Sequence, residues 1–375
     1  MLKGLYLTLL VGPAVPQPVP LPVLDSLVSA QVTTSTGDRS GFQLQFTYGK
    51  ASAIGAGLLP AGYFDPGVRV ILMATVNGIP NVLVDGLVTR QDVSPSNTPG
   101  GSTLTVTGED IAVAMDLVDL TGQLKYPALR PSDRVLTILG RYAAFGVVPK
   151  VVPSPLEEPP NPTETTFGHE GTDYAYAKRL ADEVGYTFYI EPGPAPGLST
   201  AYWGPEIRLG VPQPALNINM DAETNLESIS FHYNGLQGRN EIALVQQAQT
   251  RVPIPIPVPD INLVSPPLAV RPAVKLRTAQ VRETANLSPI QAMAKMLGSA
   301  KDAAEAIGAS GSLDVLRYGR ILKARALVGV RGAGIAYDGL YYVNSVTHDI
   351  RAGAYKQQFS LSRNGLVPIA PVVVP

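Results

Sequence analysis

Hydrophobic and polar residues alternate along much of the first part of the chain, with the period of two that is typical of β-strands. Phe42, Leu44 and Phe46 share one face of such a segment, and the residues between them are polar. The pair Asn77-Gly78 separates two apolar runs and favours the positive φ of a hairpin turn. The pattern predicts strands at 41–48, 68–76, 81–93 and 102–110 and a short helix at 111–117. Residues 1–125 are therefore predicted to form a mostly antiparallel β-domain.

A helical period begins at Ser132, the predicted N-cap, and places Val135, Leu136, Leu139 and Tyr142 on one face. The segment 149–163 that follows is rich in proline, which favours a stiff linker or excursion over a helix or a central strand.

A second helix is predicted from an N-cap at Thr172 to Gly185, with an apolar stripe along one side. Strands are predicted after it at 186–191 and 206–210. Residues 126–215 are thus expected to form an intermediate α+β domain.

A third helix is predicted at 288–307, because Ser288-Pro289-Ile290-Gln291 combines an N-cap, a proline at the first helical position and a capping-box glutamine. Its apolar stripe would pack inside its own subunit or along another element. Ser310 is expected in the turn that follows. Together with a proline-rich extended segment, this helix makes up an expected insertion over residues 251–319.

The last part of the chain returns to β-strand patterns, at 320–332, 339–350 and 354–365. Residues 216–250 and 320–375 are therefore predicted to form a second β-domain. In both β-domains an Asp-Gly pair opens an apolar strand, which favours an internal duplication. Aligning the two pairs makes Leu87 equivalent to Leu340 and Val93 equivalent to Val346.

The apolar run at 4–11 has two interpretations, a weak secretory leader or a first β-strand. No other stretch approaches the roughly 18 uninterrupted apolar residues of a membrane span.

The composition of the chain argues against several classes of function. The net charge is -1 and charged residues make up 16% of the chain, whereas soluble domains usually carry about 25%. We therefore expect no dedicated nucleic-acid or membrane-surface binding, and we expect surface buried against other chains. The chain has no cysteine, which excludes disulfides and thiolate chemistry.

No constellation of residues indicates catalysis, a cofactor or a metal. There are only three histidines, and no zinc, calcium or nucleotide-binding motif accompanies them. The acidic pairs are interpreted as solvated charge and not as a glycosidase site. The candidates considered are His169, His232, His348, Glu157, Glu158, Asp182, Glu183 and Ser310. The sequence predicts a protein that is not an enzyme.

The order of these segments resembles the late control gene D family, the central baseplate hub of contractile phage tails and injection systems. The segments that carry the resemblance are 41–46, 84–93 with 102–110, 172–191 and 338–365. They are also similar to the hub part of type VI hub-spike proteins. Each is a pattern of hydrophobicity and turns, without a chemical motif.

This resemblance implies a mainly β protein with α+β parts, in which two tube-type antiparallel β-barrel domains are joined by helix-containing intermediate segments. It implies a homotrimer that adapts a sixfold inner tube to a threefold spike. The implied partners are a separate spike protein, inner-tube or tube-initiator proteins and other baseplate proteins. The implied location is a phage virion or injection particle assembled in the bacterial cytoplasm.

Two sets of residues are candidates for contacts in such an assembly. The alternating strand near the end of the chain suggests a polar channel wall, with Arg363 at its rim. The proline-rich arm would lie on a neighbouring chain or cross its own subunit. The candidate lumen-facing residues are Gln358, Ser360 and Ser362, and the candidate arm residues are Pro253, Ile254, Pro255, Ile256, Pro257 and Val258.

Two other functions stay open at the level of the sequence. One is a secreted multi-domain β-protein that binds carbohydrate or a cell surface, suggested by the N-terminal run and by Tyr202 and Trp203. The other is a tail-associated cell-wall hydrolase, which would need one of the acidic pairs.

Overall fold

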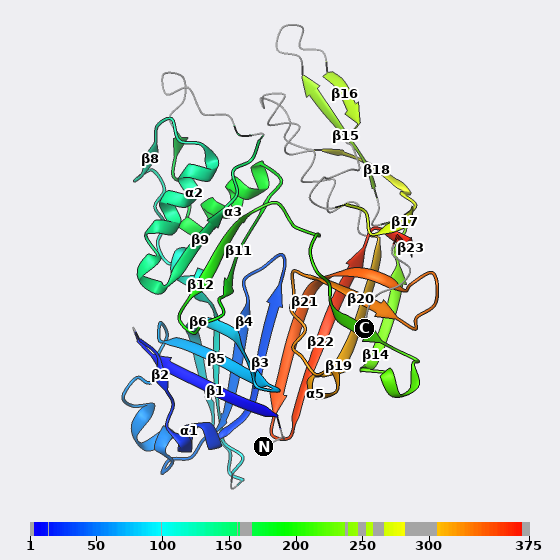
Figure 1. Ribbon diagram of the computed structural model, residues 1–375. Helices are drawn as coiled ribbons and strands as arrows, with labels where there is room; N and C mark the ends of the chain where they lie inside the picture. Colours follow the sequence, from blue (N-terminus) through cyan, green and yellow to red (C-terminus); the bar gives the residue numbers. More distant parts are fainter. Residues whose placement is uncertain are drawn as a thin grey trace.

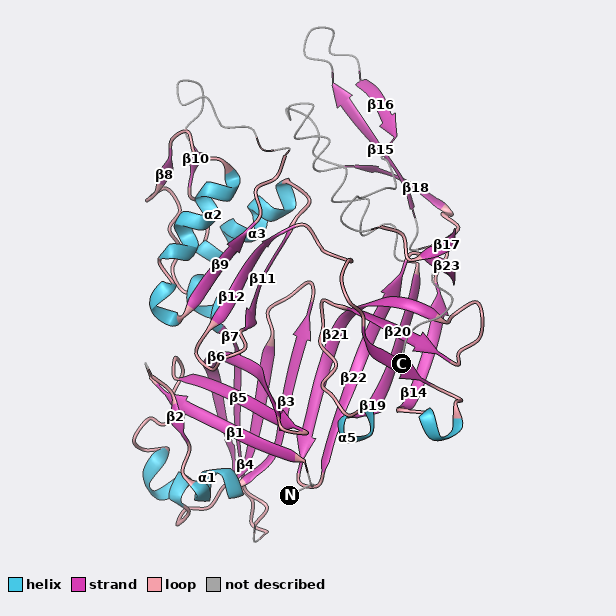
Figure 2. Ribbon diagram, in the orientation of Figure 1, coloured by secondary structure: helices cyan, strands magenta, loops and turns pink. Residues whose placement is uncertain are grey.

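The computed structural model is dominated by β-strands, as predicted, and most of them belong to one large sheet (Figures 1 and 2). The residues described are 4–13, 15–98, 100–155, 157, 167–236, 239–246, 253–257, 266–281 and 306–369. Among them, no helix has both the length and the apolar character needed to cross a membrane.

The first part of the large sheet is built from the N-terminal residues. The four predicted strands and the hairpin turn at Asn77 are present, and the apolar run at 4–11 forms a strand, whereas the strands at 17–18 and 27–35 were not predicted. Its elements are β1 (Leu5–Gly12), β2 (Gln17–Pro18), α1 (Leu21–Asp25), β3 (Leu27–Ser35), β4 (Gly41–Thr47), a π-helical turn (Ile54–Leu58), β5 (Arg69–Val76), β6 (Ile79–Ser94) and β7 (Thr103–Asp110). Asn77 and Gly78 both have positive φ, 50° and 82°. This is the conformation that a two-residue hairpin requires.

The second part comes from the later residues. Its elements are β13 (Gln213–Asn217), a 3₁₀ turn (Asp221–Glu223), β14 (Leu226–Tyr233), β19 (Ile307–Asp314), α5 (Val315–Tyr318), β20 (Leu327–Arg331), β21 (Gly339–Arg351) and β22 (Ala354–Arg363). Ser310 therefore lies within β19 and not in a turn, and only the end of the predicted strand 320–332 is a strand. Residues 288–305 of the predicted helix lie outside the described residues, and of its last two residues Ala306 belongs to no helix or strand and Ile307 begins β19.

The two parts have the same topology, and we call the strands that share it the first unit and the second unit. The first unit comprises β3 to β7, and its spatial order is β3-β4-β7-β6-β5. The second unit comprises β14 and β19 to β22, and its spatial order is β14-β19-β22-β21-β20. The chain runs through the strands of each unit in the same sequence, and the corresponding neighbours are antiparallel in both. A shared order of five strands supports an internal duplication.

The same irregularities occur at the same places in both units. The β6–β7 ladder is interrupted at Thr89, and the β21–β22 ladder is interrupted at Asn344. Immediately before each interruption, a valine exchanges two backbone hydrogen bonds with the preceding connection. Val88 does so with Val68 and Gly67, and Val343 does so with Ala326 and Arg325. β-bulges are specific features of a fold, so their repetition aligns the units residue by residue.

This alignment corrects the predicted equivalences by two residues. Since Val88 corresponds to Val343, Leu87 corresponds to Tyr342 and not to Leu340. Likewise Val93 corresponds to His348 and not to Val346. The Asp-Gly pairs that suggested the duplication therefore do not occupy equivalent positions.

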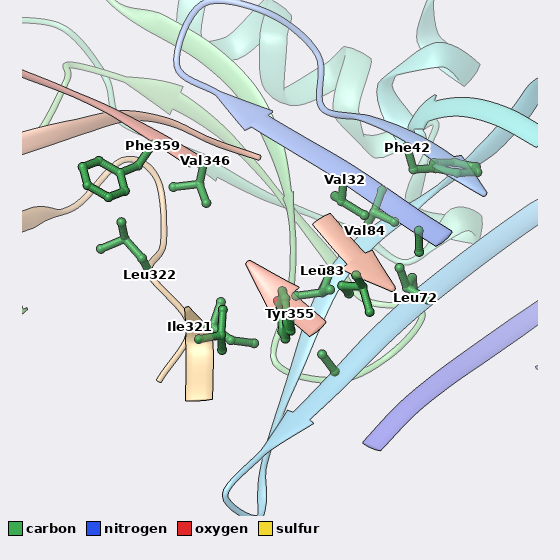
Figure 3. Packing of buried hydrophobic residues seen from close by; sticks show 14 of the residues in the cluster. Val32, Phe42, Leu72, Leu83, Val84, Ile321, Leu322, Val346, Tyr355 and Phe359 are labelled. Carbon is green, nitrogen blue, oxygen red and sulfur yellow. The ribbon is translucent and has the colours of Figure 1, made fainter. Parts of the chain in front are cut away.

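The described strands form an open sheet in place of the two closed barrels that were expected. β3 pairs with β21 and so joins the units into one sheet of 13 strands, with β14 at one end of the strand path and β2 at the other. The apolar residues of both units share one core, and Figure 3 shows Val32 and Phe42 of the first unit with Val346 and Phe359 of the second. β1 and β5 fold over the apolar side of β3, β4 and β7 and close this core.

The intermediate segment has a separate core, in which Trp203 is a large and completely buried side chain. Its elements are a 3₁₀ turn (Ile111–Asp116), β8 (Lys125–Tyr126), α2 (Pro131–Gly140), a 3₁₀ turn (Ala143–Phe145), β9 (Val147–Val151), β10 (Phe167–Gly168), α3 (Asp173–Glu183), β11 (Thr187–Pro192) and β12 (Ser199–Gly204). Thr172 caps α3 as predicted, because its hydroxyl accepts a hydrogen bond from the backbone N–H of Ala175.

Three details of this segment differ from the prediction. Arg130, and not Ser132, is the N-cap of α2, because Pro131 takes the first helical position. The start of the proline-rich excursion is the strand β9, which pairs with β12. Residues 206–210 are not a strand. Glu206 and Arg208 form an ion pair within this segment, with an N–O distance of 2.7 Å.

Two segments leave the large sheet on the same side, where the strands β7 and β14 end. The intermediate segment follows β7, and the second segment lies between β14 and β19. The strands of this second segment are β15 (Arg239–Gln246), β16 (Pro253–Pro257), β17 (Ala269–Pro272), β18 (Arg277–Val281) and, from the C-terminal part, β23 (Gly365–Pro368). Figure 1 shows both segments at one end of the molecule. The opposite end carries α1, α5 and the short turn between β21 and β22. The domain boundaries drawn from the sequence stay predictions.

Candidate assembly surface

One side of the large sheet carries hydroxyl and amide side chains from β14 across to β6. We call this surface the polar face. It follows from the strict alternation within each strand: Phe42, Leu44 and Phe46 of β4 are buried in the core, while Gln43 and Gln45 lie on the opposite side.

The pairing register assembles these side chains into rows that run across the strands and through both units. One row is Ser230, Ser310, Ser360, Ser345 and Ser35. The next row is Ser228, Ser312, Gln358, Thr347, Thr33, Gly41 and Glu109. A third row is Asp314, Lys356, Asp349, Gln31, Gln43, Thr107 and Arg90. The rows show that the surface keeps its character across the junction between β3 and β21.

Hydroxyl groups on the polar face hydrogen-bond to one another between strands. The Oγ atoms of Ser345 and Ser360 are 2.6 Å apart. The Oγ1 atoms of Thr33 and Thr347 are 3.0 Å apart and connect the two units directly. These bonds connect the hydroxyl groups of neighbouring strands along the polar face.

The charged residues of this face lie next to residues of opposite charge. The ion pairs are Arg39–Glu109, Arg90–Asp92, Arg351–Asp349 and Lys356–Glu227. The hydrogen bond from Lys356 to Glu227 raises the pKa of the lysine and keeps it charged. The surface therefore has local charges but little net charge of either sign.

The three residues predicted to face a lumen differ in exposure. Gln358 is exposed and Ser360 is half-buried, and both belong to the rows of the polar face. Ser362 is only 3% exposed, and its hydroxyl donates to Oδ1 of Asn344. Phe359 and Leu361 point into the core. Burial alternates along β22 up to Leu361 and ceases to alternate at Ser362. Whether these residues face a lumen stays a proposal.

Arg363 is not at a rim, as was expected, but completely buried. Its guanidinium donates hydrogen bonds of 2.7–2.8 Å to the carbonyl oxygens of Gly365, Asp338 and Ala336. It also stacks on Tyr341, 4.4 Å from the ring centroid. Since three carbonyls replace water around the charge, the arginine can occupy a core position of the strand.

Sequence reasoning missed the two free strand edges that border the polar face. Among the described residues, β14 pairs only with β19, and the end of β6 beyond Val88 pairs only with β7. Val93 on β6 and Tyr233 on β14 are large side chains left 39% and 38% exposed beside these edges. The duplication could have indicated these edges. The strands β3 and β21 pair with each other, whereas their equivalents in the other unit, β14 and β6, have no such partner among the described residues.

A polar hollow of about 510 Å³ opens where the polar face meets α3. Gln31, Gln43, Arg39 and Lys178 contribute to its walls. Arg39 is already engaged by Glu109 and Asp116, and Lys178 donates to the carbonyl of Gly37. The hollow continues the polar face and is not a separate site.

The candidate arm residues have a defined backbone up to Pro257. Residues 253–257 form β16, which pairs with β15 in a three-stranded sheet, so this stretch is a strand within its own chain. Val258 lies outside the described residues. The contact of this arm with a partner stays a proposal.

The histidines are separated, and two of them are buried. His169 accepts or donates a hydrogen bond with the hydroxyl of Tyr126, and burial lowers its pKa. Nδ1 of His348 lies 2.7 Å from the hydroxyl of Tyr355, and burial lowers the pKa of this histidine to about 4. His232 lies on the polar face, next to Gly308. Within the described ranges, no three His, Asp or Glu side chains gather into a possible metal site.

The residues that suggested other functions have structural partners. Glu157 accepts hydrogen bonds from the hydroxyl of Ser132 and the backbone of Ser154. Glu158 lies outside the described residues, while Asp182 and Glu183 are exposed on α3. Trp203 is fully buried and donates to the carbonyl of Ala177, so it offers no stacking surface for a sugar.

No known family model and no curated protein matches this sequence. Comparison of the three-dimensional structure with solved structures does find proteins of similar fold. A tail protein from Neisseria meningitidis is 15% identical, with a TM-score of 0.62, over 97% of this chain and 98% of the other. The 43 kDa tail protein of prophage MuSo2 from Shewanella oneidensis is 13% identical, with a TM-score of 0.62, over 96% and 99%.

A component of the E. coli type VI secretion system is 11% identical, with a TM-score of 0.54, over 93% of this chain and 78% of the other. It is described as similar to the bacteriophage T4 tail proteins gp27 and gp5. These likenesses confirm the resemblance at the level of the tail and baseplate fold, and membership of the gene D family stays a prediction. The chain has the fold of phage tail proteins and type VI hub proteins.

Proposed function

We propose that this protein is the structural baseplate hub of a contractile phage tail or injection system, a homotrimer that adapts a sixfold inner tube to a threefold spike. The observation that carries the proposal is the duplication: each chain contains two units with one strand order. Three copies in a ring therefore present six similar units, whereas each segment outside the units is present three times.

The two sides of the sheet at which its strands begin and end would bind different partners. The intermediate segment and the segment between β14 and β19 leave from one edge and differ from each other, so a trimer repeats them with threefold symmetry. The opposite edge carries mainly the connections within the units. The separate spike would bind at the first edge, and the inner tube or its initiator would bind at the second.

The polar face would line the passage through the ring. Its rows of Ser, Thr and Gln can hydrogen-bond to water, and its ion pairs leave little net charge. Such a wall attracts neither a polyanion nor an apolar chain strongly, which suits a passage that must not retain what moves through it. Gln358 and Ser360 would belong to this wall.

The role is structural and not enzymatic, and the fold is shared with tail and secretion components. The low content of charged residues, 16%, suits a chain that buries surface against copies of itself, the spike and other baseplate proteins. We propose that assembly takes place in the bacterial cytoplasm before the hub joins a virion or injection particle.

Light scattering of the purified protein tests the central claim. We expect a mass of three chains, and electron micrographs of the particles should show a ring with six similar lobes around a passage. A monomer that persists at every concentration, alone and with the spike protein, would count against the hub.

A further inference from the structure

The junction between β3 and β21 has a counterpart that a single copy of the chain cannot form. Within one copy, Ser29–Ser35 of β3 pair with Ser345–Arg351 of β21 and join the end of one unit to the start of the other. β6 is the equivalent of β21, and β14 is the equivalent of β3. The corresponding edges of β6 and β14 are both free among the described residues.

We propose that the free edge of β6 in one copy pairs antiparallel with the free edge of β14 in the next copy. The inference rests on the proposed function in that a ring needs such a junction, and it deepens it by naming the strands and their register. The edges cannot meet within one copy, because β19, β22, β21, β3, β4 and β7 lie between them.

The register follows from the residue equivalences. Thr347 corresponds to Asp92, and Thr33 corresponds to His232. Since Thr347 is opposite Thr33 within one copy, Asp92 is opposite His232 of the next copy. By the same rule, Val93 is opposite Phe231 and Ser94 is opposite Ser230.

The chemistry of the paired positions agrees with this register. Asp92 and His232 both lie on the polar face, so a carboxylate meets an imidazole where the internal junction has the hydrogen bond between Thr33 and Thr347. Val93 and Phe231 both lie on the core side of their strands. Pairing covers Val93, which is 39% exposed in one copy. A shift by one residue would place the Asp92 carboxylate and the His232 imidazole each opposite a core-side residue of the other strand.

Free edges of this kind also have a physical reason to be covered. An edge strand exposes unpaired N–H and C=O groups that template pairing with another chain. Because the two edges belong to different strands, the contact is heterologous and passes from copy to copy until a ring closes.

The absence of native cysteine makes disulfide trapping a clean test. Directly opposite residues of antiparallel strands have Cα atoms about 4.5–5.5 Å apart, within the range of a disulfide. The test variant is Asp92→Cys with His232→Cys. The matched control is Asp92→Cys with Phe231→Cys, whose thiols point to opposite faces. Thr33→Cys with Thr347→Cys serves as the positive control, because it should close within one chain and show that the protein folds.

After mild oxidation and denaturing electrophoresis without reductant, we expect the test variant to form covalent species of two and three chains. Their yield should exceed that of the matched control by about tenfold. Three chains should be the largest species, and reductant should return all of them to one chain.

The outcomes separate this inference from the proposed function. A wild-type trimer whose test variant cross-links no better than the control overturns the β6–β14 pairing and leaves the hub intact. Covalent ladders that run beyond three chains support the strand pairing and overturn the trimer. A wild-type protein that stays monomeric, with no cross-link, overturns both.

Discussion

The two units share a strand order but fill their cores in opposite ways. In the first unit Phe42 on β4 covers Gly108 on β7, where a Cβ atom would come within 2.3 Å of the phenyl ring. The equivalent pair in the second unit is Ala309 on β19 and Leu361 on β22. The large side chain has moved to the neighbouring strand and the small one has taken its place. Topology and total volume are kept while the individual residues are not, as expected for a closely packed core.

The buried polar groups differ as well. Asp110 ends β7 and accepts hydrogen bonds from the backbone of Ser40 and Ala112, although burial raises its pKa to about 6. Its equivalent at the end of β22 is Arg363, which donates to three carbonyls. The charge has changed sign between the units, and each charge is satisfied by backbone groups of its own surroundings. The polar face, in contrast, keeps uncharged hydroxyl and amide residues in both units.

Replacing Arg363 with Met should break the second unit most severely. It removes the three hydrogen bonds from the guanidinium to the carbonyls of Gly365, Asp338 and Ala336, of which the Ala336 carbonyl also accepts from the backbone N–H of Val367. Hydrogen bonds made by a charged group contribute about 1.5 to 3 kcal/mol each, so we expect a loss of more than about 4 kcal/mol. Urea denaturation measures this change. The control is Arg351→Met on the exposed end of β21, which should cost less than about 0.5 kcal/mol. A small loss for the Arg363 variant would show that the carbonyls find other donors.

Phe42→Ala should cost about 3 to 4 kcal/mol in the first unit, because it leaves a cavity above Gly108. The alanine that occupies the equivalent position in the second unit, Ala309, is accompanied by Leu361, which the first unit lacks. Thermal and urea denaturation check the value. A cost below about 1 kcal/mol would mean that the first unit can collapse onto the small pair.

His348 should make the stability depend on pH, whereas its equivalent Val93 carries no titratable group. The unfolded chain takes up a proton near pH 6.5, while burial keeps the folded pKa at about 4. Stability present above pH 6.5 is therefore lost as the pH falls towards 4, by about 3 kcal/mol. Urea midpoints between pH 4 and 8 measure it. Asp110, whose pKa burial raises to about 6, adds a slope of the opposite sign in the wild type and in the variant alike. The contribution of His348 is therefore the difference between the wild type and His348→Gln at each pH, and equal slopes in the two proteins would assign the pH dependence to other groups.

Ser310→Ala should have the smallest effect, less than about 0.5 kcal/mol, because the side chain is exposed on the polar face. The matched control is the adjacent Ala309→Ser on the buried side, which should cost about 1 to 3 kcal/mol for an unpaired hydroxyl. Equal effects in denaturation would mean that the two sides of β19 are not distinguished as described.

The sequence alone determined the local elements. The alternation of Phe42, Leu44 and Phe46, the Asn77-Gly78 turn and the Thr172 cap each specify a conformation through neighbours in the chain. It also indicated the mainly β fold and the duplication, and the family resemblance agrees with the fold of the solved tail proteins. These signals are local or periodic, so they survive without knowledge of the partners in space.

Only the tertiary structure decided the register between the units, the burial of Arg363 and Ser362, and the free edges of β6 and β14. A shift by two residues preserves the alternation of a strand, so the pattern could not tell Leu340 from Tyr342 as the equivalent of Leu87. Bulges at Thr89 and Asn344 settle this, and they are visible only in the pairing of strands. The burial of Arg363 depends on the carbonyls of Ala336 and Asp338, which a distant part of the chain places beside it, and the alternation along its own strand does not indicate such contacts.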